Sequence, residues 1–420
     1  MSFNLKELIQ YMASHNHTFF AHTPVVYHCH HFNLFLDQTI DDALGSKQGL
    51  ELRTHAAQEA TYNLLESICH FAKIKLPLDR IQVASTVFAA MGHGSLHFSA
   101  NQRGGTVRGD YTHYGFSWKD KYGKAVRRTL PADAFGAGYA AAAVEVAYDL
   151  PLGSLKAEET TCIATGAPNC EFTLSPSGTT TKRQSPVRLN ETKKALKTVF
   201  HGDQEETIAN IAQGLVQFLG TLSTDERGLL QGFGVFVTMH LAEYYNRISY
   251  DAFYHITKQM PQSTGVMGGL LRESGHVCVF NTFGGILNSP EWEGLVGPIT
   301  GNPLDIIVGC CAIGRALGFG HWTIHDFAPN QSLTLRTPST YESNYHVNRH
   351  EMANEGRCFF FQGASLAMMQ LAHRVDWKSK PDFDQDLYND LFRRGVPWVV
   401  EETKCISKGD EFCETQVHLR

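Results

Sequence analysis

The order of apolar and polar positions divides the chain into two similar runs of predicted elements. Each run has the pattern of a strand, one or more helices, a Gly-x-Gly turn, a pair of strands, a helix and a last strand that carries cysteines. The two turns are Gly92-x-Gly94 and Gly318-x-Gly320. Because helices precede and follow what reads as an antiparallel sheet, the pattern predicts an α+β fold of two homologous modules rather than a parallel βαβ fold.

The segment 53–72 has a clear helical period. Its apolar stripe contains Ala57, Leu64, Ile68 and Phe71, and its polar stripe contains His55, Glu59, Tyr62, Glu66 and His70. Carboxylates and imidazoles recur in this way in di-iron helix bundles. A polar stripe opposite an apolar one is nevertheless expected to face solvent. The alternative, that Glu59 or Glu66 joins a metal site in a second layer, stays open.

An internal duplication sets the expected domain boundaries. The polar stretch "SPSGTTTKRQSP" (175–186) has the composition of a linker. The ending "EETTCIATGAPNCEF" before it returns as "EETKCISKGDEFCET" at the C-terminus. Upstream, "YHCHHFN" (27–33) is aligned with "GHVCVFN" (275–281). We therefore expect modules at 1–174 and 263–420, a linker at 175–188, and a helical segment at 189–262 with helices near 203–222 and 225–248.

Composition excludes several classes of protein. Of the 420 residues 43% are hydrophobic and 19% are charged, which is typical of a folded chain rather than a disordered one. The net charge is −6 and basic residues do not cluster, so we expect no nucleic-acid partner. The N-terminus lacks the features of a signal peptide, and the apolar runs are too short to span a bilayer. We expect a soluble, cytoplasmic protein whose ten cysteines are reduced.

The two endings resemble the end of the 4-vinyl reductase domain family. They share Glu-x-x-Cys, a glycine, and a second cysteine followed by glutamate, in the first copy Cys-Glu-Phe. The family includes archaeal hydrocarbon-binding proteins and the sensory domains of phenol- and xylene-responsive activators, so the resemblance implies an α+β module that binds a small apolar or aromatic molecule. In its phenol-sensing members zinc sits on one glutamate and three cysteines. The matching positions in the second module are Glu342, Cys358, Cys405 and Cys413.

The chemistry of this quartet agrees with the resemblance. Three thiolates and a carboxylate in a closed tetrahedron suit a structural zinc ion, although the cysteines could also be buried small hydrophobic residues. The first module keeps Cys162 and Cys170, but Pro131 or Asp133 stands at the position of Cys358. A metal in the first module is therefore expected to have imidazole and carboxylate ligands and open positions, which suits iron, copper or zinc.

Histidines supply the candidate ligands for that metal. The chain contains 21, and "YHCHHFN" holds three of them. On a strand His28 and His30 share a face, so we expect them to bind non-haem iron, with His97 as the third ligand and His93 or His113 as alternatives for that position. His31, His93 and His113 are candidate acid/base residues. The alternative is that these histidines only form hydrogen bonds in the core.

Two functions follow from these sites. The first is a metal-dependent oxidoreductase that acts on a small, largely apolar molecule with iron in the first module and zinc in the second. The second is a sensor or accessory protein that binds such a molecule around a structural zinc and performs no catalysis. The family precedent and the two central helices leave a homodimer open, since amphipathic helices also pack within one chain.

Overall fold

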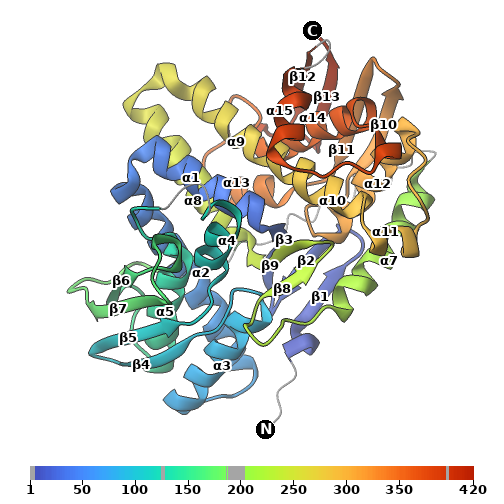
Figure 1. Ribbon diagram of the computed structural model, residues 1–420. Helices are drawn as coiled ribbons and strands as arrows, with labels where there is room; N and C mark the ends of the chain where they lie inside the picture. Colours follow the sequence, from blue (N-terminus) through green and yellow to red (C-terminus); the bar gives the residue numbers. More distant parts are fainter. Residues whose placement is uncertain (1–4, 124–127, 186, 188–203, 394–396) are drawn as a thin grey trace.

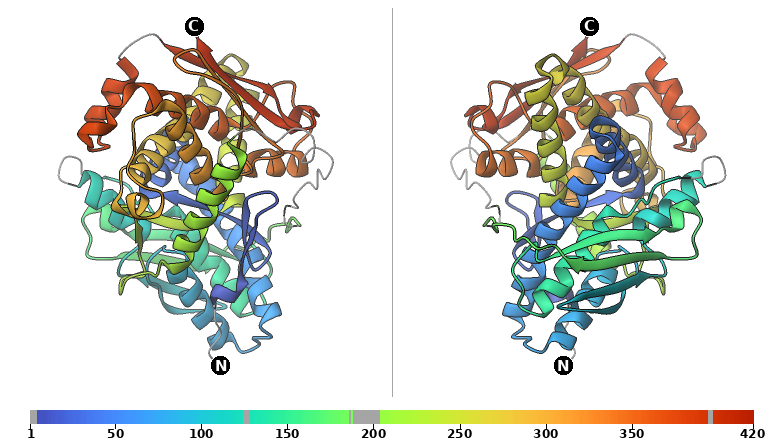
Figure 2. Two further views of the ribbon diagram at one scale, coloured as in Figure 1. Left: turned by 90° about the vertical axis from the view of Figure 1, so that its right-hand side faces the viewer. Right: turned by 90° about the vertical axis from the view of Figure 1, so that its left-hand side faces the viewer.

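The computed structural model describes residues 5–123, 128–185, 187, 204–393 and 397–420 (Figure 1). Three antiparallel sheets flanked by helices make up this part of the chain, which confirms the α+β prediction. Below, the first half denotes residues 5–185 and the second half denotes residues 204–420. In Figures 1 and 2 one four-stranded sheet lies near each end of the molecule, and the five-stranded sheet lies between them.

The central sheet joins the two halves of the chain. Its order is β1-β2-β3-β9-β8, in which β1 (Ile9–Met12), β2 (His17–Phe20) and β3 (Thr23–Cys29) come from the first half, and β8 (Leu230–Gly232) and β9 (Val235–Leu241) from the second. Strands β3 and β9 are antiparallel, and Tyr27 is the register partner of Met239. One sheet therefore crosses the boundary between the halves.

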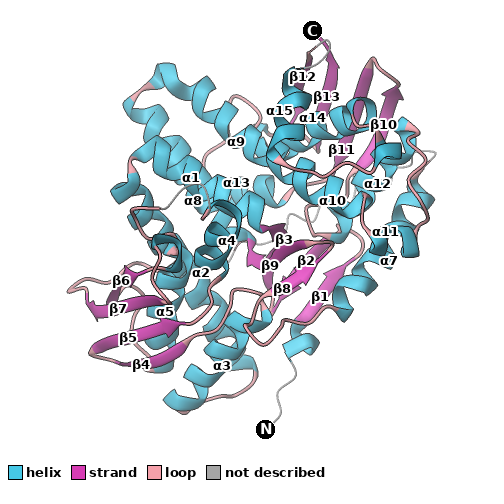
Figure 3. Cartoon of the chain, in the orientation of Figure 1, coloured by secondary structure: helices cyan, strands magenta, loops and turns pink. Residues whose placement is uncertain are grey.

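The outer sheets show the duplication directly (Figure 3). The first has the order β4-β5-β7-β6, made of β4 (His97–Asn101), β5 (Gly104–Gly109), β6 (Leu155–Thr161) and β7 (Cys170–Pro176). The second has the order β10-β11-β13-β12, made of β10 (Thr323–Ala328), β11 (Ser332–Thr337), β12 (Trp398–Lys404) and β13 (Cys413–Leu419). Their register shifts also correspond, after Glu159 in β6 and after Glu402 in β12.

Helices follow the same order in both halves. Those of the first half are α1 (His30–Leu44), α2 (Ser46–Phe71), α3 (Pro77–Ala90), α4 (His113–Tyr122) and α5 (Ala134–Ala147). Those of the second are α7 (Glu205–Thr221), α8 (Ala242–Gln259), α9 (Thr264–Cys278), α10 (Gly284–Leu287), α11 (Pro290–Leu295), α12 (Pro303–Ala316), α13 (Tyr341–Arg349), α14 (Phe359–Arg374) and α15 (Gln385–Arg393). Among the residues described, no helix combines the length and the apolar character that crossing a bilayer requires.

Helices α5 and α14 form the centre of each half. Every residue of α5 is buried, as expected for a helix that is apolar on all sides. It packs on α2 at Gly138, where a Cβ atom would lie 2.2 Å from the carbonyl oxygen of Thr54. Gly363 of α14 makes the equivalent approach to α9, with a Cβ position 1.9 Å from the carbonyl oxygen of Arg272. These glycines let each pair of helices touch through their backbones.

Two sequence predictions are wrong at the start of the second half. The predicted helix 225–248 contains strands β8 and β9 and only the beginning of α8. The loop between these strands is Phe233-Gly234, and both residues have positive φ (53° and 75°), as in a type I′ hairpin. The segment "GHVCVFN" lies in α9 and the π-helical turn after it, so the counterpart of the strand β3 is β9.

The polar stripe of α2 is partly buried, contrary to expectation. Glu59 is 1% exposed, and its carboxylate lies 2.5 Å from the guanidinium of Arg247 on α8. Glu66 is half-exposed and pairs with Arg183, while His55 and His70 are exposed. A cation from the second half thus balances Glu59, and the structure places neither glutamate in a group of candidate metal ligands.

Candidate metal cluster and aromatic chambers

Three thiols and a carboxylate converge in the second half. Cys358 precedes α14, Cys405 follows β12, and Cys413 begins β13. The Sγ atom of Cys358 lies 3.6 Å from those of Cys405 and Cys413, which are 4.0 Å apart. Sulfur atoms about 2.3 Å from a tetrahedral zinc ion are about 3.8 Å from one another. The distances between the sulfur atoms therefore fit a metal ion without rearrangement. All three cysteines are also fully buried.

Glu402 completes the cluster. Its ligand atom lies within 4.8 Å of the three thiol sulfurs. Oε2 accepts hydrogen bonds from the backbone N–H of Cys358 (3.1 Å) and from Nε2 of Gln362 (2.9 Å). Oε1 is buried and has no hydrogen-bond partner within the described residues. Burial raises the pKa of this carboxyl well above its usual value, which a bound cation would oppose.

Glu402 replaces Glu342 in the candidate ligand set. Glu342 lies on α13, and its carboxylate oxygens accept the backbone N–H groups of Phe360 (2.8 Å) and Phe361 (3.2 Å) at the start of α14. Burial raises the pKa of Glu342 to about 8. It therefore holds a helix N-terminus, where orphan N–H groups need acceptors. The Glu-x-x-Cys motif was the available signal in the sequence, because it contains both Glu402 and Cys405 of this group.

The first half carries a related group. Glu159, Cys162 and Cys170 have ligand atoms within 4.8 Å of one another, on the elements that correspond to those of the second cluster. Asp133 precedes α5 as Cys358 precedes α14, which selects Asp133 over Pro131 as the counterpart of Cys358.

The structure does not bring His28, His30 and His97 together. Strand β3 ends at Cys29 and α1 begins at His30, so the alternation of a strand does not apply to this pair. His97 has an exposed side chain on β4, and its Nε2 lies 3.2 Å from Asp110. Within the described residues, the groups that could hold a metal ion contain no histidine. His31 contacts Lys121 of α4.

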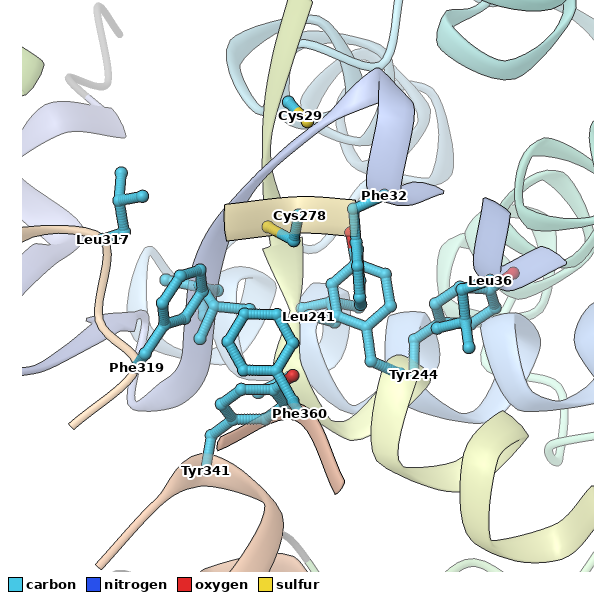
Figure 4. Packing of buried hydrophobic residues seen from close by; sticks show 14 of the residues in the cluster. Cys29, Phe32, Leu36, Leu241, Tyr244, Cys278, Leu317, Phe319, Tyr341 and Phe360 are labelled. Atoms are coloured by element: carbon cyan, nitrogen blue, oxygen red, sulfur yellow. The ribbon is translucent and has the colours of Figure 1, made fainter. Parts of the chain in front are cut away.

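His28 instead fills an aromatic chamber of the second half. Its ring centroid lies 3.8 Å from that of Phe32, 4.7 Å from Phe319 and 5.2 Å from Phe360. Figure 4 shows Phe360 between Phe32 of α1 and the rings of Phe319 and Tyr341. We call these five residues the second chamber. An enclosed hollow of about 10 Å³ beside it leaves room for no more than one water molecule.

A matching chamber in the first half is more polar. The ring of His240, from β9, lies 4.2 Å from Phe135 and 4.7 Å from His93. Its Nε2 is 3.1 Å from the Tyr114 hydroxyl. We call His93, His113, Tyr114, Phe135 and His240 the first chamber. The predicted acid/base residues His93 and His113 thus lie close together, with centroids 6.3 Å apart, whereas His31 lies elsewhere.

Nitrogen atoms of the first chamber lack partners. Both ring nitrogens of His93 and the Nδ1 atom of His113 have no hydrogen-bond partner among the described residues. The other nitrogen of His113 is 2.9 Å from Nδ2 of Asn33. Burial lowers the pKa values of His93, His113 and His240 well below 6.5, so these imidazoles are neutral at pH 7. Neutral imidazole can both donate and accept a hydrogen bond.

A cleft of about 420 Å³ lies on the other face of the central sheet. Tyr27 and Met239 belong to its lining, and their side chains alternate with those of His28 and His240 along β3 and β9. Most of the remaining lining is apolar, including Phe20, Leu219 and Leu230. The cleft therefore offers a space of ligand size.

Comparisons with known proteins give structural similarity but no family. No model of a known protein family matches the chain, and no curated protein matches it. Among solved structures, the chain is similar to the crystal structure of the phenol-responsive sensory domain of the transcription activator PoxR with phenol. The identity is 10% over 52% of this chain and 92% of that chain, with a TM-score of 0.35.

Proposed function

We propose that the protein binds a small, largely apolar molecule that carries a hydroxyl group, and that it does so without chemical conversion. The first chamber is the proposed binding site. The resemblance of the two Cys-rich endings to the 4-vinyl reductase domain family supports the same class of ligand. Zinc in the second-half cluster is structural in this proposal, because four protein ligands leave no open position.

The unpartnered nitrogen atoms of His93 carry this proposal. His93 is 1% exposed and its ring stacks on Phe135 at 4.4 Å. A buried polar group without a partner costs about 1–3 kcal/mol, so such groups are usually paired. A hydroxyl on a bound molecule would pair one of these nitrogens, while Phe135 and Phe88 would contact its apolar part.

The second chamber does not offer the same function. Its counterparts of His93 and His113 are Phe319 and Tyr341, and these rings fill the space around His28. The duplicated halves therefore differ at these two positions, which carry imidazoles in the first chamber and aromatic side chains in the second. The predicted oxidoreductase depends on a metal site of His28, His30 and His97. However, β3 ends between His28 and His30, and the side chain of His97 is exposed.

Binding of two matched probes tests the proposal. Phenol and toluene have similar shapes, but only phenol has a hydroxyl group. We expect calorimetry to show that the full chain binds phenol about tenfold more tightly, the effect of a hydrogen bond worth about 1.4 kcal/mol. His93→Phe should remove this preference. Binding should also be slow, since the chamber residues are buried and must open first.

A cleft-filling variant serves as the control. Met239→Trp reduces the space in the cleft and leaves the first chamber unchanged, so phenol should still bind. Loss of binding in Met239→Trp but not in His93→Phe would place the ligand in the cleft and contradict the proposed site. Recovery of unaltered phenol after aerobic incubation is expected. Conversion of phenol would contradict the absence of catalysis.

A further inference from the structure

We propose that the first half holds a second divalent metal ion on Glu159, Cys162 and Cys170, whose ligand atoms lie within 4.8 Å of one another. Asp133 lies outside this group. It would become the fourth ligand by a movement of its side chain toward the ion. The site goes beyond the proposed function, which assigns a metal only to the second half. It also differs from the imidazole site that the sequence predicted for this half.

The positions of the thiols match those of the second cluster. Cys162 follows β6 and Cys170 begins β7, as Cys405 follows β12 and Cys413 begins β13. Their Sγ atoms are 3.9 Å apart, against 4.0 Å in the second half. Both cysteines of the first half are fully buried, so they are spaced and shielded as ligands of a single ion would be.

Asp133 stands in the position of the missing third thiol. Its backbone N–H donates to Oε2 of Glu159 (2.7 Å), as the N–H of Cys358 donates to Glu402. A threonine hydroxyl lies beside each cluster, Thr112 at 3.3 Å from the sulfur of Cys170 and Thr340 at 3.2 Å from that of Cys358. The surroundings are thus retained, and one ligand type has changed from sulfur to oxygen.

Two buried carboxylate oxygens are left without partners. Asp133 is 1% exposed, and its Oδ1 accepts the N–H of Gly136 at 2.6 Å. Its Oδ2 and Oε1 of Glu159, which is 5% exposed, have no hydrogen bonds in the part of the chain described. Guanidinium groups balance other buried acids of this half, such as Glu59. The hydrogen bonds and ion pairs described for Asp133 and Glu159 include no guanidinium or ammonium group. A cation held by Glu159 and the two sulfurs would pair the free oxygen of Glu159 and attract the nearby carboxylate of Asp133.

The donor set determines the expected metal preference. Thiolates favour soft ions, whereas carboxylates suit harder ones. With two thiolates instead of three, this site should hold zinc less tightly than the second-half cluster and exchange its ion sooner with a chelator. We therefore expect one tightly held and one exchangeable ion in each chain.

Cobalt titration of the full chain tests the inference, because cobalt bound by thiolates gives a sulfur-to-metal charge-transfer absorption. The metal-free protein should take up two equivalents. Cys405→Ser with Cys413→Ser should leave one equivalent, with an absorption typical of two thiolates. Cys162→Ser with Cys170→Ser should leave the equivalent of the second-half cluster, with an absorption typical of three thiolates. If only the second-half cluster failed to bind metal, the three-thiolate absorption would be lost and the two-thiolate absorption would remain. That result differs from failure of the proposed first-half site.

Asp133→Cys gives an independent result if a double variant does not fold. It should raise the affinity for cobalt at the weaker site and increase the charge-transfer absorption of that site by about half, from two thiolates to three. Cys69→Ser, a buried cysteine outside both clusters, is the matched control and should change neither. The inference is overturned if the folded Cys405→Ser, Cys413→Ser protein binds no cobalt through sulfur, or if Asp133→Cys leaves both affinity and absorption unchanged.

Discussion

His28 and His240 follow directly after the register partners Tyr27 and Met239 on the antiparallel strands β3 and β9. Each imidazole packs against the opposite half of the chain. His28 contacts Phe319 and Phe360 of the second half, and His240 contacts His93 and Phe135 of the first. The two halves have therefore exchanged strands, and each chamber is completed by a histidine from the other half.

This exchange predicts that neither half folds by itself. Fragments 1–187 and 204–420 would each lose a chamber histidine and expose the edge of β3 or β9. We expect each fragment to be insoluble or to unfold without cooperativity, and the two to form a 1:1 complex when produced together. Circular dichroism and analytical ultracentrifugation can measure both outcomes. A full chain cut at a protease site introduced between 187 and 204 is the control. A cooperatively folded monomer of either fragment would contradict the exchange.

Acid pH should destabilise the protein through its buried histidines. Burial lowers the pKa of His28 well below 6.5, so the unfolded state binds the proton first as the pH falls. The stability that neutral His28 permits is present above pH 6.5 and declines below it, by about 1.4 kcal/mol per pH unit. In urea unfolding between pH 6.5 and 5, His28→Phe should show a shallower decline than the wild type. His70→Asn, on the exposed face of α2, should not. Parallel curves for His28→Phe and the wild type would refute this.

The two glutamates near the second-half cluster should behave differently. Glu342→Gln keeps one of the two acceptors for the N–H groups of α14, so we expect a loss of about 1–2 kcal/mol in unfolding free energy with unchanged zinc content. Glu402→Gln removes a candidate ligand and should weaken zinc retention during dialysis against a chelator. The opposite pattern, with zinc lost only from Glu342→Gln, would restore Glu342 to the ligand set.

Close backbone contact between α14 and α9 predicts intolerance at one glycine. Gly363→Ala would place a Cβ atom 1.9 Å from the Arg272 carbonyl oxygen, so the helices must separate. We expect a cost of about 1–3 kcal/mol in thermal or urea unfolding. Gly214→Ala is the matched control on α7, where a Cβ atom meets nothing within 4 Å. That change should stabilise the protein by about 0.5–1 kcal/mol. Equal effects of both changes would contradict the close packing.

The repeated Cys-rich ending was the most informative part of the sequence. It indicated the duplication and, through the family resemblance, the α+β class, and it holds Cys405 and Cys413, two of the four candidate ligands in the second-half cluster. It also contained Glu402 within Glu-x-x-Cys, but the choice between Glu402 and Glu342 depends on which carboxylate the fold brings to the three sulfurs, and spacing alone does not reveal this. The pairing of Asp133 with Cys358 likewise needed the helix starts of α5 and α14.

The histidine prediction depended on one local assumption. His28 and His30 share a face only if the strand continues, and the chain turns into α1 between them. His240, which the sequence analysis missed, has a visible signal. An aromatic residue follows four positions after it, Tyr244, just as Phe32 follows His28. The exchange of β3 and β9 could not be predicted, because pairing between distant strands leaves no local pattern.

X-ray absorption at the zinc edge tests the second-half cluster most directly. The protein should carry Cys162→Ser and Cys170→Ser, so that only this cluster contributes. The account predicts about one zinc ion per chain with a first shell of three sulfur atoms near 2.3 Å and one oxygen near 2.0–2.2 Å. A first shell dominated by imidazole nitrogen, or a folded protein that retains no zinc, would contradict it.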